Sequence, residues 1–305
     1  MSTNRRPGGS AILAGRPVAR IGYGAMQLPG PGVLGPPRDR AVALAVLRRA
    51  VELGVNQIDT AQYYGPDVAN ELIHAALHPY PEDLVLVTKV GAERDRQGRW
   101  ISAQRPQELR AGVEANLRSL EVERMDVVNL RLLGGRGPSD GGMRVDLDSQ
   151  LAEMIALRAE GKIGGIGISS VNVAQFRQAL PAGIACVQNA YSLLDRADEL
   201  LLDLCREHDI AWVPYFPLGS AFAGAAKVTE HPAVLAAAAA QGATPAQVVL
   251  AWLLAQDVVV IPKARNLAHV SENRAALDLE LTREDLSELD HAFPPPRKKT
   301  SLGMK

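Results

Sequence analysis

The sequence predicts an α/β protein with a (β/α)8 TIM barrel, and three observations support this. From residue 38 onward, segments with apolar residues at helical spacing alternate with short apolar segments typical of strands. These short segments are apolar on both faces, as a parallel sheet covered by helices requires. With a first strand near Ile21, eight strands alternate with eight helices. A doubly wound sheet of similar size is the structural alternative.

The expected elements follow one another in a regular order. An N-terminal β-hairpin, residues 10–14 and 17–21, turns at Gly15 and Arg16 and precedes the alternation. Gly54 is expected to end the first helix, because glycine is favoured just after a helix C-terminus. The expected helix and strand pairs are 38–53 with 55–59, 68–77 with 84–89, 106–120 with 125–130, 147–160 with 163–168, 173–180 with 184–187, 198–208 with 211–215, and 244–256 with 258–261, before a closing helix 267–277.

Two further helices, 231–241 and 282–293, exceed the eightfold count and are expected outside the barrel. Loops 91–103 and 134–144 follow the third and fourth strands, at the barrel face that usually carries the active site, and are expected to cover the substrate. Without a composition shift or linker, residues 1–305 are expected to form one domain. Its ends, 1–9 and 294–305, are expected to be flexible.

Composition narrows the class of protein. Hydrophobic residues make up 47% and charged residues 22% of the chain, so a large core can be buried. A net charge of -1 with scattered Lys and Arg disfavours nucleic-acid and acidic-membrane partners. Cys186 and Cys205 show no metal-ligand or disulfide spacing, and no apolar run reaches the spanning length of about 18 residues. We expect a soluble cytoplasmic protein without a metal; its oligomeric state does not follow from the sequence.

Two glycine-rich stretches, 22–27 and 165–170, invite comparison with the dinucleotide-binding fingerprint. Both lack its third glycine and the later acidic residue. Glycines in tight strand ends are therefore the preferred interpretation. A nicotinamide cofactor, if bound, must use another type of site.

Ionisable residues follow two consecutive expected strands. Asp59 and Tyr64 come after one of them, and Lys89 ends the next. A lysine close to a tyrosine lowers the pKa of the phenol, and a carboxylate would hold that lysine by charge pairing. A surface Asp–Lys pair beside a packed tyrosine is the alternative. The grouping suggests proton chemistry at the carboxyl ends of the strands.

Several motifs occur together in order: Ile-Asp-Thr-Ala-Gln-Tyr-Tyr-Gly at 58–65, Lys89, Ile-Gly-Ile-Ser-Ser at 166–170, Val-Gln-Asn-Ala-Tyr at 187–191, Ile-Pro-Lys-Ala-Arg-Asn at 261–266, and Glu-Asn at 272–273. With these motifs the chain resembles the aldo-keto reductase superfamily over nearly its whole length. The resemblance implies an NADPH-dependent carbonyl reductase on a barrel. Tyr64 would be the general acid, Lys89 would tune it, and Asp59 would hold Lys89.

The histidine that usually ends strand four in this family is replaced by Arg131. No histidine occurs between residues 79 and 207. A buried arginine needs a carboxylate or an anionic ligand, and it cannot act as an acid near neutral pH. It could therefore orient and polarise the carbonyl or bind an ionised substrate group, with a structural ion pair as the alternative. A second cation near Tyr64 would also favour the ionised phenol.

The Asn-Leu-Arg variant at 129–131, with segments 22–39 and 213–219, is similar to the bacterial pyridoxal reductase branch of the family. This implies reduction of pyridoxal to pyridoxine, in which a readily ionised ring hydroxyl would meet Arg131. Close relatives with other substrates remain an alternative, as do alcohol oxidation, broad aldehyde detoxification, and a sensor that binds NADPH without turnover.

The resemblance also assigns residues to NADPH. Ser169, Ser170 and Gln188 would hold the nicotinamide amide, with Tyr215 against the ring. Ser170 departs from the usual asparagine. The assigned residues for the 2′-phosphate are Lys263 and Arg265, those for the adenine are Glu272 and Asn273, and Gly24, Met26 and Leu218 complete the cofactor site.

Overall fold

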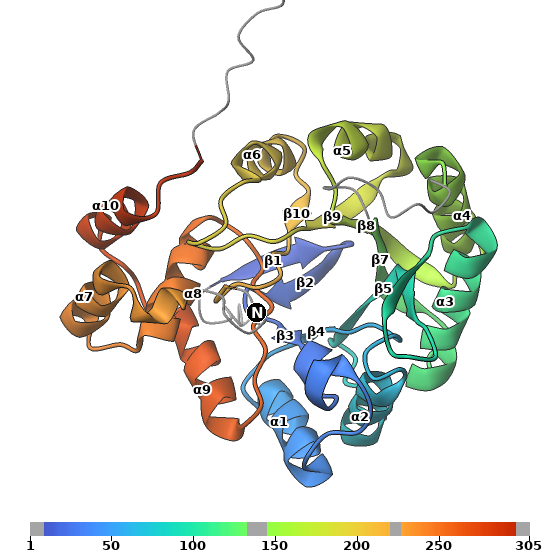
Figure 1. Ribbon diagram of the computed structural model, residues 1–305, viewed down its shortest axis with the longest axis horizontal. Coiled ribbons are helices and arrows are strands. Elements are labelled where there is room, and N and C mark those ends of the chain that lie inside the picture. The colour runs from blue at the N-terminus through green and yellow to red at the C-terminus, as the bar shows by residue number, and fades with distance from the viewer. Residues whose placement is uncertain (1–8, 133–144, 220–226, 297–305) are drawn as a thin grey trace, which may run out of the picture.

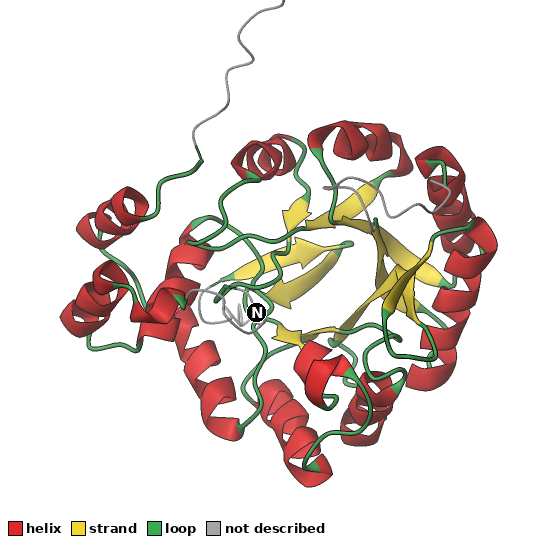
Figure 2. Ribbon diagram, in the orientation of Figure 1, coloured by secondary structure: helices red, strands yellow, loops and turns green. Residues whose placement is uncertain are grey.

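The computed structural model describes residues 9–132, 145–219 and 227–296. Its central sheet has the strand order β10-β9-β8-β7-β5-β4-β3, with parallel pairing along this path. Helices surround the sheet on the outside (Figures 1 and 2). The predicted (β/α)8 barrel is therefore confirmed, and the doubly wound alternative is wrong.

The ring of strands closes through the expected eighth strand, 258–261, which is too irregular to form a named strand. Val259 N donates to Trp212 O at 3.0 Å, and Val260 N donates to Arg20 O at 2.8 Å. Gly22 N in turn donates to Val260 O at 2.8 Å. These bonds join β10 to the first barrel strand.

The strands lie close to their expected positions. They are β1 Ser10–Leu13, β2 Arg16–Ala19, β3 Tyr23–Gly24, β4 Gln57–Asp59, β5 Val85–Arg94, β6 Trp100–Ala103, β7 Met125–Arg131, β8 Ile163–Ser169, β9 Ile184–Gln188 and β10 Ala211–Trp212. The helices are α1 Arg40–Glu52, α2 Val68–Leu77, α3 Pro106–Leu120, α4 Leu147–Ala159, α5 Val173–Ala179, α6 Glu199–Glu207, α7 Pro232–Gln241, α8 Pro245–Ala255, α9 Leu267–Ala275 and α10 Arg283–Ala292. Side chains cap several of these helices, for example Asp39 on α1 and Thr244 on α8.

The N-terminal hairpin lies across the barrel axis (Figure 1). Leu13 and Val18 are buried in a cluster with barrel-lining residues such as Val85 and Val127. Asn56, just before β4, holds the hairpin: its Oδ1 accepts from Ala19 N at 2.8 Å, and its Nδ2 donates to Pro17 O at 2.9 Å. The hairpin therefore covers the barrel at the N-terminal ends of the strands.

One expected loop has a different structure. Residues 91–103 do not form an irregular cover; β5 continues to Arg94 and pairs antiparallel with β6, with Gly91 opposite Ala103. The loop prediction missed a hairpin turn at Asp95, whose carboxylate accepts from Gln97 N and Arg99 N. Loop 134–144 and the ends 1–8 and 297–305 lie outside the described residues.

The two extra helices, α7 and α10, lie outside the ring as expected (Figure 1). The α10 side chain Asp290 accepts from Arg196 Nη1 at 2.8 Å and from Trp252 Nε1 at 3.2 Å.

Among the described helices none alone has the length and apolarity of a membrane span, and only the bent pair of α7 and α8, which meet at 93°, has them in combination.

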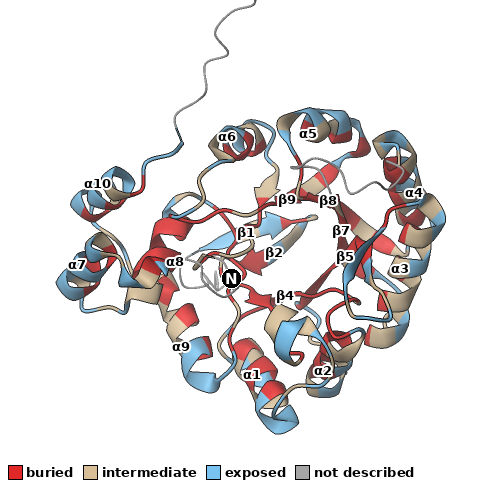
Figure 3. Cartoon of the chain, in the orientation of Figure 1, coloured by how far each residue is buried: buried red, intermediate tan, exposed pale blue. Residues whose placement is uncertain are grey.

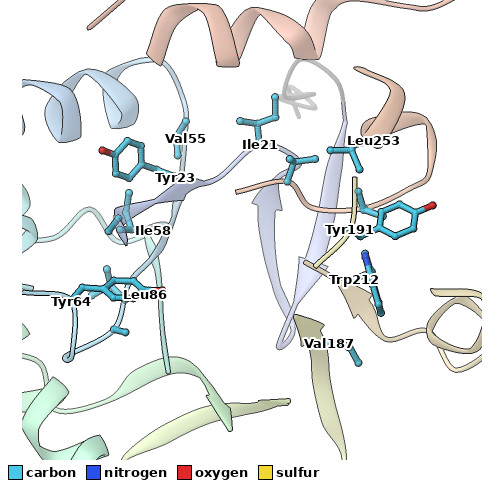
Figure 4. Close-up of a cluster of buried hydrophobic side chains, with 14 of the residues drawn as sticks. Ile21, Tyr23, Val55, Ile58, Tyr64, Leu86, Val187, Tyr191, Trp212 and Leu253 are labelled. Atoms are coloured by element: carbon cyan, nitrogen blue, oxygen red, sulfur yellow. The ribbon is translucent and has the colours of Figure 1, made fainter. Parts of the chain in front are cut away.

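Buried residues line the strands and the inner faces of the helices, while the outer helix faces are exposed (Figure 3). The large cluster between sheet and helices includes Ile58, Leu86, Trp212 and Leu253 (Figure 4). Tyr64 belongs to the same cluster. The tyrosine after β4 is thus anchored in the core rather than in a loose loop.

Candidate active site

A buried ion pair lies at the carboxyl ends of β4 and β5. Lys89 Nζ donates to the Asp59 carboxylate and to Thr60 O, the latter at 3.0 Å. The other Asp59 oxygen accepts from Gln188 Nε2 at 2.8 Å. Asp59 and Lys89 are each 3% exposed, so the surface-pair alternative is wrong. Pairing and additional hydrogen bonds are what allow two charges to remain buried.

Polar side chains behind this ion pair fix the two strands. Thr60 Oγ1 donates to Asn70 Oδ1 at 2.8 Å, and Thr88 Oγ1 donates to Asn116 Oδ1 at 2.6 Å. Asn70 Nδ2 joins the two by donating to Asn116 Oδ1 at 3.0 Å. This network connects β4 and β5 to α2 and α3, so the Asp59–Lys89 geometry is preorganised.

Tyr64 lies beside this pair, with Lys89 Nζ 5.3 Å from its ring centroid. Burial raises the pKa of the Tyr64 phenol above its ordinary value; Asp59 adds to the rise and Arg131 opposes it. The expectation that nearby cations lower the pKa of the phenol is therefore wrong, because burial outweighs their effect. The phenol stays protonated at neutral pH and is able to donate a proton.

Arg131 ends β7 and is half-buried. Burial acts to lower its pKa, but the phenol oxygens of Tyr63, Tyr64 and Tyr215 oppose this and leave the pKa raised. The guanidinium is therefore charged. Within the described residues no Asp or Glu forms an ion pair with Arg131, and its Nε is buried without a hydrogen-bond partner. The structural ion pair considered as the alternative is not found there.

The structure adds an aromatic group that sequence reasoning missed. Trp100 on β6 packs edge-on against Tyr63, with ring centroids 5.2 Å apart, and against Tyr64 at 6.5 Å. Its ring centroid is 6.0 Å from Arg131 Cζ. The signal available was the Asp95 to Gly98 turn flanked by short extended segments, which is typical of a hairpin. Recognising it would have placed Trp100 on a strand beside the site.

Residues assigned to the nicotinamide lie together next to Asp59, on the side of Gln188, which donates to that carboxylate. Ser169 and Gln188 end the neighbouring strands β8 and β9, where they are paired in register. Ser169 Oγ and Gln188 Oε1 are buried and have no partner among the described residues. Ser170 Oγ lies 3.3 Å from the Tyr215 hydroxyl. Unpaired buried polar atoms of this kind fit a carboxamide, which both donates and accepts hydrogen bonds.

A second group lies after the eighth strand segment. Lys263 Nζ is buried without a hydrogen-bond partner in the described part of the chain. Burial and the neighbouring Arg265 lower the pKa of Lys263 to about 8. Arg265 is exposed, and its Nε donates to Gln27 Oε1 at 2.7 Å. These cations precede the N-terminus of α9, a combination that suits a phosphate.

The other assigned cofactor residues are placed less specifically. Asn273 Nδ2 donates to Lys263 O at 3.4 Å, and Glu272 is half-buried on the same helix, α9. Met26 and Leu218 are half-buried against the core. At Gly24 a Cβ would come within 2.8 Å of Ile261 O, so this glycine is required by barrel closure.

The described residues contain no group of three or more His, Cys, Asp or Glu side chains able to hold a metal ion.

The arrangement as a whole can deliver a proton to an oxygen atom and stabilise negative charge nearby. Tyr64 is a protonated donor, and Lys89 and Arg131 are cations close to it. Ser169, Gln188 and Lys263 offer buried polar atoms without partners in the described residues. Carbonyl reduction needs these functions: a proton donor, charge stabilisation and a hydride source held in place.

Comparison with known proteins agrees with this geometry. The model of the aldo/keto reductase family matches residues 20–293. Pyridoxine 4-dehydrogenase of Escherichia coli is 47% identical over 283 residues, which cover 91% of this chain and 96% of the relative. Methylglyoxal reductase YeaE of the same organism is 33% identical over 271 residues, covering 87% and 89%.

A solved structure is also similar along its whole length. The aldo/keto reductase of Klebsiella pneumoniae, in complex with NADP and acetate, superimposes with a TM-score of 0.79 at 28% identity, covering 97% of this chain and 99% of that one. Fold, site and sequence comparisons thus lead to one assignment. The protein is an oxidoreductase that belongs to the aldo/keto reductase family.

Proposed function

We propose that this enzyme uses NADPH to reduce pyridoxal, an aromatic aldehyde with an ionisable ring hydroxyl, to pyridoxine. The observation that carries the proposal is Arg131, a charged guanidinium beside Tyr64 with no carboxylate partner among the described residues. A half-buried cation without a carboxylate partner is costly, and an anionic oxygen on the substrate would offset that cost. The 47% identity to pyridoxine 4-dehydrogenase supports the same substrate pair.

The proton transfer is assigned to Tyr64. Its buried phenol is protonated at neutral pH and would donate to the carbonyl oxygen as negative charge develops there. Lys89, held by Asp59 and Thr60 O, would stabilise the phenolate that remains. A bound nicotinamide supplies the hydride. In the reverse direction, alcohol oxidation, the same residues act in the opposite order.

For the cofactor, the proposal rests on the unpaired polar groups. Ser169 Oγ and Gln188 Oε1 would hold the carboxamide, and Tyr215 would lie against the ring. Lys263 and Arg265 would bind the 2′-phosphate that distinguishes NADPH from NADH. The relative from K. pneumoniae, which was solved with NADP, supports this choice.

The direct test is an NADPH-oxidation assay with pyridoxal, in which pyridoxine is identified as the product by chromatography. We expect stoichiometric conversion and a higher kcat/KM for pyridoxal than for benzaldehyde. A kcat/KM for benzaldehyde equal to or above that for pyridoxal would instead support a broad aldehyde reductase. NADPH binding without oxidation by any aldehyde would support the sensor alternative.

The proposed compartment is the cytoplasm. Its support is that Cys186 and Cys205 are free thiols buried in the described structure. Burial raises the pKa of each thiol to about 12, so neither is reactive. The lack of a disulfide between the two cysteines of the described structure agrees with a reducing environment.

A further inference from the structure

We propose that Trp100 is the wall against which a planar substrate ring lies, and that Arg94 is the positioning residue that holds Trp100 in place. The inference rests on the proposed function, because it concerns the substrate of the same site. It adds a specificity element that lies outside the proton-donating group and the cofactor residues.

Trp100 has the position that a substrate wall requires. Its ring packs edge-on against Tyr63 and Tyr64, and Arg131 Cζ is 6.0 Å from its centroid. It is nevertheless 39% exposed, whereas Trp212 and Trp252 are 2% and 0% exposed. A large indole left partly open close to the proton donor and to Arg131 can still bury area against a ligand ring.

Arg94 covers one face of this indole, with its Cζ 3.5 Å from the ring centroid. Its terminal nitrogens are already engaged: Nη1 donates to Gly98 O at 2.7 Å, and Nη2 donates to Gly32 O at 3.0 Å and Val33 O at 3.2 Å. Both terminal nitrogens of Arg94 are therefore committed to backbone carbonyls, whereas its Nε, like that of Arg131, is buried without a hydrogen-bond partner in the described residues. Its role is to hold the ring and leave the remaining indole surface to the substrate.

The segment that Arg94 binds, around Gly32 and Val33, is hydrogen-bonded to the residue next to the proton donor. Leu34 bridges Gly65, the residue after Tyr64, and Gly35 N donates to Gly65 O at 3.0 Å. The hairpin turn packs on the same segment, since a Cβ at Gly98 would come within 2.7 Å of Leu34 Cδ2. Trp100 is thus fixed relative to Tyr64 both through ring contacts and through this backbone link.

The substrate class follows from these placements. A flat aromatic ring gains stacking or edge contact with Trp100 while its aldehyde meets Tyr64, and an ionised ring oxygen meets Arg131. A short linear aliphatic aldehyde gains neither contact. The wall should therefore act mainly on binding of the ring, and so on KM.

The test compares kcat/KM for benzaldehyde with that for propanal, because neither aldehyde has a group for Arg131. Trp100→Leu should lower the benzaldehyde-to-propanal ratio about tenfold, and Trp100→Phe should restore it to within about threefold of wild type. Arg94→Met should lower the ratio about fivefold through KM, and should make Trp100 emission more accessible to acrylamide. Ile101→Ala, a neighbouring residue that is 41% exposed, is the matched control and should leave the ratio unchanged.

A Trp100→Leu ratio within twofold of wild type would overturn the wall. An Arg94→Met loss that is equal for both aldehydes and lies in kcat would overturn the positioning role. If neither aldehyde is reduced, equilibrium dialysis with pyridoxine replaces kinetics: binding weakened by Trp100→Leu supports the wall, and unchanged or absent wild-type binding overturns it. Failure to reduce pyridoxal, with the ratio still dependent on Trp100, would reject only the proposed substrate.

Discussion

The two ends of the barrel differ in how their buried polar groups are paired. At the N-terminal end, the hairpin residues Leu13 and Val18 complete an apolar cluster, and Asn56 pairs both of its amide atoms with the backbone, although both amide atoms of Gln57 at the start of β4 are buried without partners in the described structure. At the other end, Ser169 Oγ, Lys263 Nζ and Arg131 Nε are buried without partners in the described structure.

This difference indicates which end contributes to fold stability and which to ligand binding. Satisfied polar groups and dense apolar packing stabilise the fold, whereas unpaired buried groups cost stability unless a ligand pairs with them. The end of the barrel at the carboxyl ends of the strands, called the open end below, is therefore less stabilised but able to bind a ligand, as is common at functional sites. Substitutions at the two ends should therefore have different effects, mainly on activity at the carboxyl ends of the strands and mainly on stability at the N-terminal ends.

Tyr64→Phe removes the proton donor while leaving the ring in the core. The kcat for aldehyde reduction should fall about 10²- to 10⁴-fold, the range typical of a lost general acid. NADPH binding, measured by the change in cofactor fluorescence, should persist. Tyr63→Phe is the matched control, since it removes a neighbouring buried phenol to which no proton transfer is assigned, and its loss in kcat should be far smaller. Equal losses in the two variants would contradict the assignment of Tyr64.

Leu13→Ala probes the closed end. Removing a fully buried leucine should lower the free energy of unfolding by about 2–5 kcal/mol, because lost burial and a residual cavity add together. Urea unfolding followed by circular dichroism measures this loss. At temperatures where the variant remains folded, kcat/KM should stay within twofold of wild type. A large loss of activity in the folded variant would show that the two ends are coupled.

Arg131→Met tests the unpaired cation of the open end. If it pairs with an ionised ring hydroxyl, kcat/KM for pyridoxal should fall about 10- to 100-fold, as expected for a hydrogen bond between charged groups. The loss for benzaldehyde should be smaller. Arg131→Lys keeps the charge but loses the planar fork, so an intermediate loss for pyridoxal is expected. The same loss for both aldehydes would rule out the pairing.

The smallest effect concerns Lys263. Its pKa of about 8 in the free protein means that the amine is charged below pH 8 and loses its charge above it. A bound phosphate would raise that pKa, so NADPH affinity should be full below pH 8 and fall by up to about tenfold per pH unit above it. NADH affinity should change less. Fluorescence titrations at pH 7 and 9 measure the affinities for NADPH and NADH. Arg265→Ala should narrow the preference for NADPH over NADH at either pH. If the affinities for the two cofactors change equally with pH, the phosphate site is contradicted.

Much of the fold could be predicted because it depends on local patterns. Signals such as Gly54 after the first helix, and strands that are apolar on both faces, indicate where elements begin and end. The position of Asp59 and Lys89 at the ends of neighbouring strands also followed, since parallel strands bring their carboxyl ends together. The hairpin at 91–103 was missed because its turn was interpreted as an irregular loop.

By itself, the sequence determined the order of the barrel elements and the identity of the groups available for chemistry, because both depend on residue type and spacing. Only the tertiary structure decided how those groups behave. It showed that burial raises the pKa of Tyr64, that Arg131 has no carboxylate partner in the described residues, and that Arg94 covers one face of Trp100. The physical reason is that desolvation, pairing and stacking depend on which distant residues come into contact, and that is determined by packing across the whole barrel.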